Sequence, residues 1–258
     1  MTSLDQKAAW AAPLHRWWRS TLADVPWADQ LPASNALLPH LSLASTWGWR
    51  SNFNWEFEHL ASTFGFLECD SHLCQDRSKL RRVSLADYID KEITRRTYPA
   101  SIGSVRLHIE AARLTQEYLA LAGSRNLYSH LDKDLAPCLK WLVLGPKLAV
   151  NRFHEDVWNT AAWNVLLTGA KTWLLASPAW ESEIRKYVCI QKPGDVLFVP
   201  SGWRHEVLYD IDSIAITENY VDVDNAAIVS AEQARTGQVG LANLTRKLAQ
   251  ICSRSALS

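Results

Sequence analysis

Short apolar segments separated by turn residues dominate the second half of the chain. From about residue 138, LKWLVLGP, AWNVLLTG, KTWLLASP, DVLFVPSG, HEVLYD and SIAITENYV follow one another, and Gly, Pro, Ser or Asp stands at most of their ends. Strands of this length and spacing are typical of an all-β sandwich or barrel. The pattern therefore predicts a mainly β core in this half.

Helical patterns precede the predicted core. Residues 1–30 predict one or two helices with Trp and Leu on one side, and residues 55–66 have helical spacing up to Gly65. The segment VSLADYIDKEITRR begins at a plausible N-cap, Ser84, with Asp87 three positions later, which is close to a capping box.

Helical periodicity returns after the last predicted strand, over residues 223–258, where Gly237 and Gly240 mark a break between two pieces. Because no internal repeat or low-complexity linker is visible, we expect one domain with flanking helices. Its expected parts are a helical, Trp-rich extension packed on the barrel (1–100), the core (101–222) and the carboxyl-terminal helices (223–258).

Composition narrows the class of protein. The 258 residues are 48% hydrophobic and 21% charged, so a sizeable core is expected rather than disorder. Lys plus Arg equal Asp plus Glu at 27 each, which argues against a nucleic-acid partner. Seven of the 13 tryptophans precede residue 60. They are expected to serve as core packing, with a substrate-facing aromatic wall as the alternative.

The cysteines and the apolar runs bear on location. Five cysteines without framework spacing predict reduced thiols and a cytoplasmic protein, although Cys69, His72 and Cys74 leave a small chance of a zinc site. The amino terminus has no apolar stretch typical of a signal peptide, and no run approaches membrane-spanning length. We therefore expect no membrane partner.

His154 and Asp156 are the first candidate metal ligands. In an extended segment, side chains two positions apart point to the same side, so these two can converge while Glu155 points away. His205, after a Pro-Ser-Gly turn, can supply a third ligand. Two imidazoles and one carboxylate form the facial arrangement of non-heme Fe(II) oxygenases. The alternative is that a His-x-Asp pair occurs by chance and His205 is an ordinary polar residue at a strand end.

Lys171 is the second unusual feature, because it stands among apolar residues and alternates with Trp173 and Leu175. A buried ammonium requires an anion, and the carboxylate of a bound cosubstrate would provide one. On a later strand, Thr217 shares a face with Asn219 and could donate a hydrogen bond to the same carboxylate. The alternative is a lysine whose stem lies on Trp173 while its head reaches water.

The stretches HEDVWNTAAWNVLLTGAKTW, KPGDVLFVPSGWRHEVLYD and IAITENY resemble the core of JmjC-type, cupin-like 2-oxoglutarate-dependent oxygenases of the hydroxylase branch. The resemblance is strong over about residues 138–222 and weaker upstream. It implies a double-stranded β-helix, or jelly roll, with flanking amino- and carboxyl-terminal helices. It also implies that O₂ is the oxidant and that the carboxyl-terminal helices form a homodimer.

The resemblance assigns roles to individual residues. Fe(II) would be bound by His154, Asp156 and His205. The distal carboxylate of 2-oxoglutarate would pair with Lys171, and the remaining residues expected in the cosubstrate pocket are Thr217, Asn164, Asn219 and Tyr128.

The expected activity is hydroxylation of an amino-acid side chain, in a peptide or a protein or as the free amino acid. Asp156 favours hydroxylation, because related halogenases lack the carboxylate ligand. The alternatives are an N-methyl demethylase, a hydroxylase of a natural product or a tRNA base, and a cupin-like binding module without catalysis. The demethylase would act by the same chemistry as the hydroxylase. The binding module gives no reason for the ligand triad and the lysine to occur together.

Overall fold

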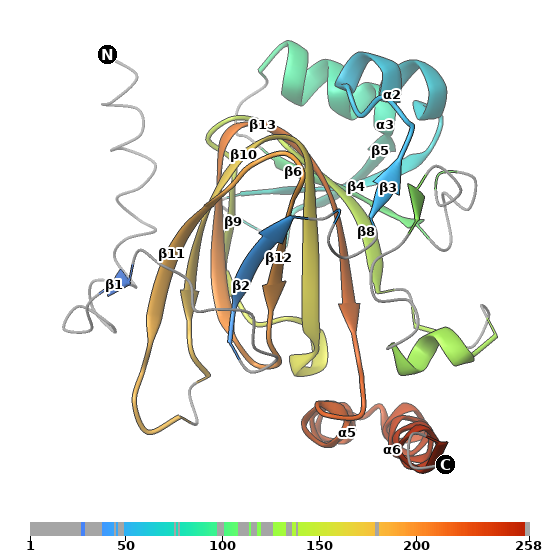
Figure 1. Ribbon diagram of the computed structural model, residues 1–258. Helices are drawn as coiled ribbons and strands as arrows, with labels where there is room; N and C mark the ends of the chain where they lie inside the picture. Colours follow the sequence, from blue (N-terminus) through green and yellow to red (C-terminus); the bar gives the residue numbers. More distant parts are fainter. Residues whose placement is uncertain are drawn as a thin grey trace.

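Figure 1 shows a computed structural model of the chain. It describes residues 38–43, 45, 49–74, 76, 78–96, 101–107, 114, 126–132, 136–137, 139–178 and 181–255, and the backbone of β1 (Trp27–Ala28) and β7 (Tyr118–Leu119). The helices expected in residues 1–30 otherwise lie outside the described residues, as does Cys138.

Two long antiparallel strands, β10 (Ala161–Ala176) and β13 (Arg204–Tyr220), pair with each other through the centre of the fold. Each changes its outer neighbour halfway. The first half of β10 pairs with β12 (Asp195–Val199) and the second with β11 (Lys186–Gln191). β13 pairs first with β9 (Val150–His154) and then with β8 (Lys140–Gly145). The halves thus belong to two facing layers, which confirms the expected jelly roll.

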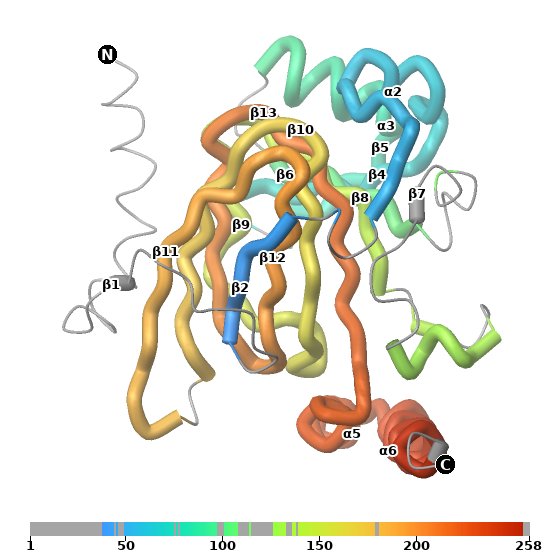
Figure 2. The backbone as a smooth tube through the Cα atoms, in the orientation of Figure 1, coloured from blue at the N-terminus to red at the C-terminus, as the bar shows by residue number. Residues whose placement is uncertain are grey.

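A bend in β10 links the two layers. The register of β10 against β13 shifts between Leu166 and Lys171, and Gly169 lies there with a φ of 99°. A Cβ at Gly169 would collide with Ser213 Oγ and Asp212 O, so this turn requires glycine. Figure 2 shows β10 and β13 bending over side by side. The sequence predicted separate strands on either side of the glycine, whereas the structure has one continuous bent strand.

One layer continues beyond β8 through β6 (Ser101–Arg106), β4 (Glu68–Leu73) and β5 (Leu80–Ser84), and β2 (His40–Leu43) borders β12 at its other edge. A separate pair joins β3 (Arg50–Ser51) to β7. The sequence pattern predicted β8 and β12 but none of the strands from β2 to β7. β4 and β5 precede residue 100 in the chain, yet they belong to the same sheet as β6 and β8, which follow it. The expected division of the chain at residue 100 stays a prediction.

Two of the predicted helical segments before the core, those at residues 55–66 and 83–96, are present. α2 (Phe57–Phe64) ends at Gly65, and α3 (Leu85–Tyr88) continues as a π-helical segment, η2 (Ile89–Thr94). Ser84 Oγ accepts a hydrogen bond from Asp87 N at 3.1 Å, as the capping pattern predicted.

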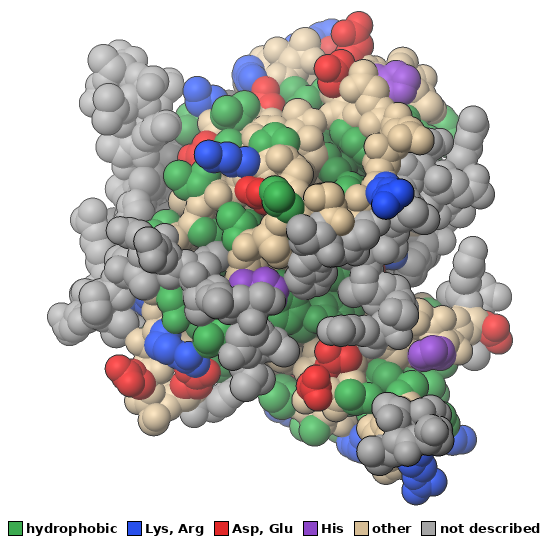
Figure 3. Space-filling model, in the orientation of Figure 1, with side chains coloured by type: hydrophobic (Ala, Val, Ile, Leu, Met, Phe, Trp, Pro, Cys, Tyr) green, Lys and Arg blue, Asp and Glu red, His purple; other side chains and the backbone are tan. Residues whose placement is uncertain are grey.

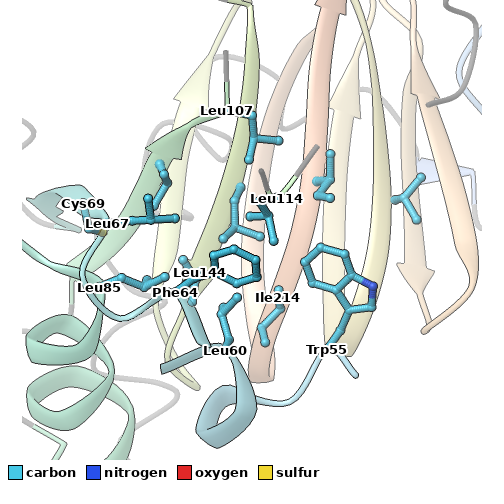
Figure 4. Packing of buried hydrophobic residues seen from close by; sticks show 14 of the residues in the cluster. Trp55, Leu60, Phe64, Leu67, Cys69, Leu85, Leu107, Leu114, Leu144 and Ile214 are labelled. Carbon is cyan, nitrogen blue, oxygen red and sulfur yellow. The ribbon is translucent and has the colours of Figure 1, made fainter. Parts of the chain in front are cut away.

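These helices cover the outer face of one layer. Leu60, Phe64 and Leu85 share a hydrophobic cluster with Leu144 and Ile214 of the strands (Figure 4). Trp55 belongs to the same cluster, and Trp49 packs against it. For these two tryptophans, core packing is therefore the observed role.

The carboxyl-terminal helices lie at the opposite end of the molecule from α2 and α3 (Figure 1). They are α5 (Ala226–Arg235) and α6 (Val239–Ser255), and the break between them contains Gly237 with a φ of 85°. α6 packs against the 3₁₀ turn η4 (Leu127–His130), and α5 packs against the turn η5 (Val157–Asn159). Leu127, Val221 and Val229 belong to one hydrophobic cluster in this region. The predicted pair of helices and the break are thus confirmed.

The surface drawn in Figure 3 mixes acidic, basic and apolar side chains among the described residues, without a basic stripe. This distribution agrees with the zero formal net charge. None of the helices in the described part of the chain combines the length and the apolar character needed to cross a bilayer.

Candidate metal and anion site

A cavity of about 620 Å³ lies within the jelly roll, between residues of both layers. Seven of the eight predicted site residues line it: His154, Asp156, Asn164, Lys171, His205, Thr217 and Asn219. The strands β9, β10 and β13 supply most of these side chains, so the bend that joins the two layers also brings the site together.

His154, Asp156 and His205 converge on one point of the cavity. Each offers a ligand atom, and the three atoms lie within 4.8 Å of one another. β9 ends at His154, whose partner across the sheet is His205 on β13, and the two ring centroids are 4.2 Å apart. Asp156 follows in extended conformation, while Glu155 is exposed. This is the convergence that the alternating pattern predicted.

Both imidazoles are oriented through their Nδ1 atoms. His154 Nδ1 lies 2.7 Å from Arg152 O, and His205 Nδ1 lies 3.4 Å from Trp203 O. A carbonyl oxygen can only accept, so each Nδ1 carries the hydrogen and each Nε2 keeps its lone pair. Hydrogen bonds of this kind fix the tautomer of metal-binding histidines. The two rings are therefore prepared to bind a cation through Nε2.

The third group, the carboxylate of Asp156, is only partly compensated. Its Oδ2 is buried and has no hydrogen-bond partner among the described residues. Burial raises the pKa of Asp156, and the nearby His154 and the amide of Asn219 lower it in part. A buried acceptor without a donor is costly unless something positive satisfies it. Two nitrogens and this oxygen fit an Fe(II) ion with further coordination positions open.

Lys171 lies in the same cavity and is almost wholly buried, with 1% of its surface exposed. Its Nζ lies 4.9 Å from the centre of the Tyr209 ring, and no described residue forms an ion pair or a hydrogen bond with it. Burial lowers the pKa of Lys171 to about 7. This burial does not fit the alternative, a lysine whose head reaches bulk water from the end of the strand. An anion in the cavity could pair with the ammonium.

Three further predicted residues lie around the lysine and the triad. Asn164 is 6% exposed, and its Oδ1 is buried without a hydrogen-bond partner among the described residues. Thr217 donates its hydroxyl hydrogen to Trp163 O at 2.9 Å, so binding a carboxylate would require this hydroxyl to turn. Asn219 donates from Nδ2 to Thr160 Oγ1 at 2.9 Å and lies close enough to Asp156 to lower its pKa.

Tyr128 is placed elsewhere, contrary to the expectation of a cosubstrate contact. Its hydroxyl lies 2.8 Å from Thr245 Oγ1 of α6 and accepts from Gln233 Nε2 of α5 at 2.6 Å. The side chain is buried in the cluster that joins η4 to the carboxyl-terminal helices, outside the cavity lining. The sequence suggested Tyr128 by its type and rough position, but its hydroxyl is satisfied by the helices.

Three cavity residues had no assigned role in the sequence analysis. Tyr209 lies four positions after His205 on β13, so the period-two pattern of a strand places both on one face and could have identified Tyr209. Gly145 has no side chain and leaves room for the Tyr209 ring. Asn151 lies three positions before His154, and its Oδ1 is buried without a partner among the described residues. Trp158 lines the cavity with a φ of 53°, an uncommon conformation for a bulky residue.

The zinc alternative at Cys69, His72 and Cys74 finds no support. In the part of the chain that the structure describes, His154, Asp156 and His205 form the one group of three or more potential ligands. Cys69 and Cys74 form no disulfide and are buried in different hydrophobic clusters.

Sequence comparison finds relatives named as oxygenases, hydroxylases and demethylases. The chain is 31% identical over 139 residues to the bifunctional arginine demethylase and lysyl-hydroxylase psr-1 of Caenorhabditis elegans, covering 40% of this chain and 35% of that protein. It is 26% identical over 246 residues to the human 2-oxoglutarate and iron-dependent oxygenase JMJD4, covering 74% of this chain and 58% of the relative. The lysine-specific demethylase JMJ21 of Arabidopsis thaliana is 25% identical over 222 residues, or 72% of this chain and 23% of the relative.

No family model matches the chain. The matched region spans less than two thirds of each of these relatives. Within that region, the similarities confirm the resemblance to JmjC-type iron- and 2-oxoglutarate-dependent oxygenases.

Proposed function

We propose that this chain, a relative of the JmjC-type oxygenases, is an Fe(II)- and 2-oxoglutarate-dependent dioxygenase that hydroxylates an amino-acid side chain in a peptide or protein. The observation that supports it most is the pairing of two features in one cavity. Three metal-type ligands converge on one point, and a buried ammonium lies nearby without an acidic partner among the described residues. A dicarboxylic keto acid that chelates the metal satisfies both.

In this proposal, His154 and His205 bind iron through Nε2 and Asp156 binds it through its carboxylate. When bound, the iron supplies the oxidation chemistry, in which loss of CO₂ from 2-oxoglutarate accompanies insertion of one oxygen atom of O₂ into a C–H bond. The protein orients the reactants and limits access of water. A cation also satisfies the buried Asp156 Oδ2.

Lys171 binds the distal carboxylate of 2-oxoglutarate, because a charge-assisted hydrogen bond there offsets the free-energy cost of burying the ammonium. The face of Tyr209 lies against the same ammonium. Asn164 and Thr217 lie on neighbouring strands and pair across the sheet, so both side chains reach this part of the cavity. Asn219 belongs nearer to the iron, because its amide acts on Asp156.

The substrate is a side chain carried by a peptide or protein. This rests on the relatives, whose names include a lysyl-hydroxylase and demethylases acting on arginine or lysine. At about 620 Å³, the cavity is within the usual range for small-molecule sites, about 300–1,000 Å³. Demethylation is the second candidate, because the same site can hydroxylate an N-methyl carbon and two of these relatives are demethylases. A binding module without catalysis would leave the triad and the buried lysine without a purpose.

We further propose a cytoplasmic location and a homodimer through the carboxyl-terminal helices. Cys69, Cys74, Cys189 and Cys252 form no disulfide, as a reducing compartment would favour. Ile228, Val239 and Ile251 of α5 and α6 are between 41% and 56% exposed, which leaves apolar surface for a second copy.

The test is to incubate the protein with Fe(II), ascorbate and 2-oxoglutarate against a panel of peptides, proteins and free amino acids, analysed by mass spectrometry. The expected result is a mass gain of one oxygen atom on a peptide or protein, absent with the Asp156→Ala variant. Loss of a methyl group from methylated peptides would favour the demethylase instead. No turnover of 2-oxoglutarate with any substrate, together with no binding of metal, would refute the proposal.

A further inference from the structure

Gln191, the last residue of β11, joins the two halves of the bent strand β10. Its side chain is fully buried. Gln191 Oε1 accepts a hydrogen bond from Trp173 Nε1 at 2.9 Å, and Gln191 Nε2 donates to Asn164 O at 2.8 Å. The same Nε2 lies 3.2 Å from Asp195 O at the start of β12. One amide therefore bonds to β10 before the bend and after it.

The two residues that this amide holds belong to different parts of the site. Trp173 lines the cavity, and its ring lies 5.6 Å from that of His205, with 40° between the planes. The bond from His205 Nδ1 to Trp203 O is long, at 3.4 Å, so packing against Trp173 contributes to the orientation of this imidazole. Asn164 lines the cosubstrate side, with its Oδ1 buried and without a partner among the described residues.

We propose that Gln191 is a positioning residue for both the metal and the cosubstrate. It fixes the indole of Trp173, which supports the metal ligand His205, and it fixes the backbone from which Asn164 reaches the cavity. The inference rests on the proposed function, since it assigns Gln191 a role through residues that touch iron and 2-oxoglutarate. Gln191 itself lies behind the cavity wall and is not a catalytic residue.

The chemistry of the amide explains why this position suits glutamine. Trp173 Nε1 is a donor, whereas Asn164 O and Asp195 O are acceptors, and a side-chain amide is the group that offers both an acceptor and two donors. Methionine has a similar length but would leave the indole N–H and both carbonyls without this partner. Glutamate could still accept from the indole, but its charge would face two carbonyl oxygens.

The experiment compares Gln191→Met with a matched control, Gln233→Met. Gln233 is also fully buried, and it bonds to Tyr128 and Thr245 at the carboxyl-terminal helices rather than at the cavity. Both substitutions remove the hydrogen bonds of one buried glutamine amide. Mn(II), which does not oxidise during the measurement, is titrated calorimetrically into each metal-free protein, and 2-oxoglutarate is then titrated into the Mn(II)-loaded protein.

We expect Gln191→Met to weaken Mn(II) binding about tenfold, the lower end of the range for residues that orient metal ligands. Its affinity for 2-oxoglutarate should also fall, whereas Gln233→Met should leave both affinities within about twofold of wild type. Equal effects of the two variants, or no effect of Gln191→Met, would overturn the inference while leaving the proposed function intact. Wild-type protein that binds neither Mn(II) nor 2-oxoglutarate would overturn both.

A second variant tests the other end of the bond, and it decides the matter if Gln191→Met does not fold. Trp173→Phe keeps an aromatic ring beside His205 but removes the N–H that Gln191 holds. We expect it to weaken Mn(II) binding as well. Where both single variants fold, the double variant should bind Mn(II) no more weakly than the weaker single one, because the two act through one contact. Wild-type Mn(II) affinity in Trp173→Phe, or additive losses, would contradict the proposed chain of contacts.

Discussion

Replacing Lys171 by methionine should stabilise the ligand-free protein while abolishing tight binding of 2-oxoglutarate. Lys171 is 1% exposed, and burial lowers its pKa from 10.5 to about 7. A difference of that size corresponds to about 5 kcal/mol of unfavourable free energy in the folded state. Water in the cavity reduces this cost, so we expect a gain in unfolding free energy of about 2 to 5 kcal/mol at pH 6.

The gain should depend on pH with a definite sign. Below pH 7 the lysine is protonated in both the folded and the unfolded chain, and the cost of burying the charge is fully present. Between pH 7 and 10.5 the folded chain is neutral at this site while the unfolded chain still binds the proton. The unfolding free energy of the wild type therefore rises with pH across this window. The advantage of Lys171→Met should shrink as pH rises and vanish near the upper limit.

Urea unfolding of wild type and Lys171→Met at pH 6, 7.5 and 9 measures this difference, and calorimetry of the Mn(II)-loaded proteins measures 2-oxoglutarate affinity. We expect the affinity to fall by about 100-fold or more, because the variant lacks the cation for the distal carboxylate. Lys140→Met is the matched control. Lys140 pairs with the buried Glu218 at 3.0 Å, so its removal should destabilise the protein. A Lys171→Met protein less stable than wild type at pH 6, or a difference that grows with pH, would refute the reasoning.

Three further outcomes are expected. Asp156→Ala should abolish substrate-coupled oxidation and Mn(II)-dependent 2-oxoglutarate binding while the circular dichroism spectrum stays native; full activity would remove Asp156 from the metal site. Tyr128→Phe should lose about 1 kcal/mol in urea unfolding, because its hydroxyl bonds to Thr245 and Gln233, yet keep wild-type affinity for 2-oxoglutarate; a large loss of affinity would restore the sequence-based assignment. Free Mn(II) at 100 times its dissociation constant should add about 2.7 kcal/mol and raise the melting temperature by about 5–10 °C, reversibly with a chelator; an unchanged melting temperature would contradict a folded-state metal site.

The candidate site could be predicted largely because its key residues follow local patterns. His154 and Asp156 obey the period-two rule for extended chain, and Thr217 and Asn219 share a strand face for the same reason. Lys171 was conspicuous because a charge within an apolar strand requires compensation. These signals depend on a few neighbouring residues, so they survive without knowledge of the fold.

Other features depend on contacts that a single sequence does not display. Gly169 looked like the end of a strand, although it bends one that continues to Ala176. Asn151 and His154 are three positions apart on β9, so simple alternation would place them on opposite faces of the strand. The register shift between His205 and Val207 lets both line the same cavity. Tyr128 was placed by type, whereas its partners come from helices more than 100 residues away. Gln191 gave no signal, because its role consists of bonds across strands.

The most direct test of the central claim is the structure of crystals grown with Mn(II) and 2-oxoglutarate, with the metal located by anomalous scattering. We predict a single ion bound by His154, Asp156 and His205, and a keto acid whose distal carboxylate contacts Lys171 Nζ. An ion bound by other residues, or a keto acid whose distal carboxylate lies away from Lys171, would contradict the account.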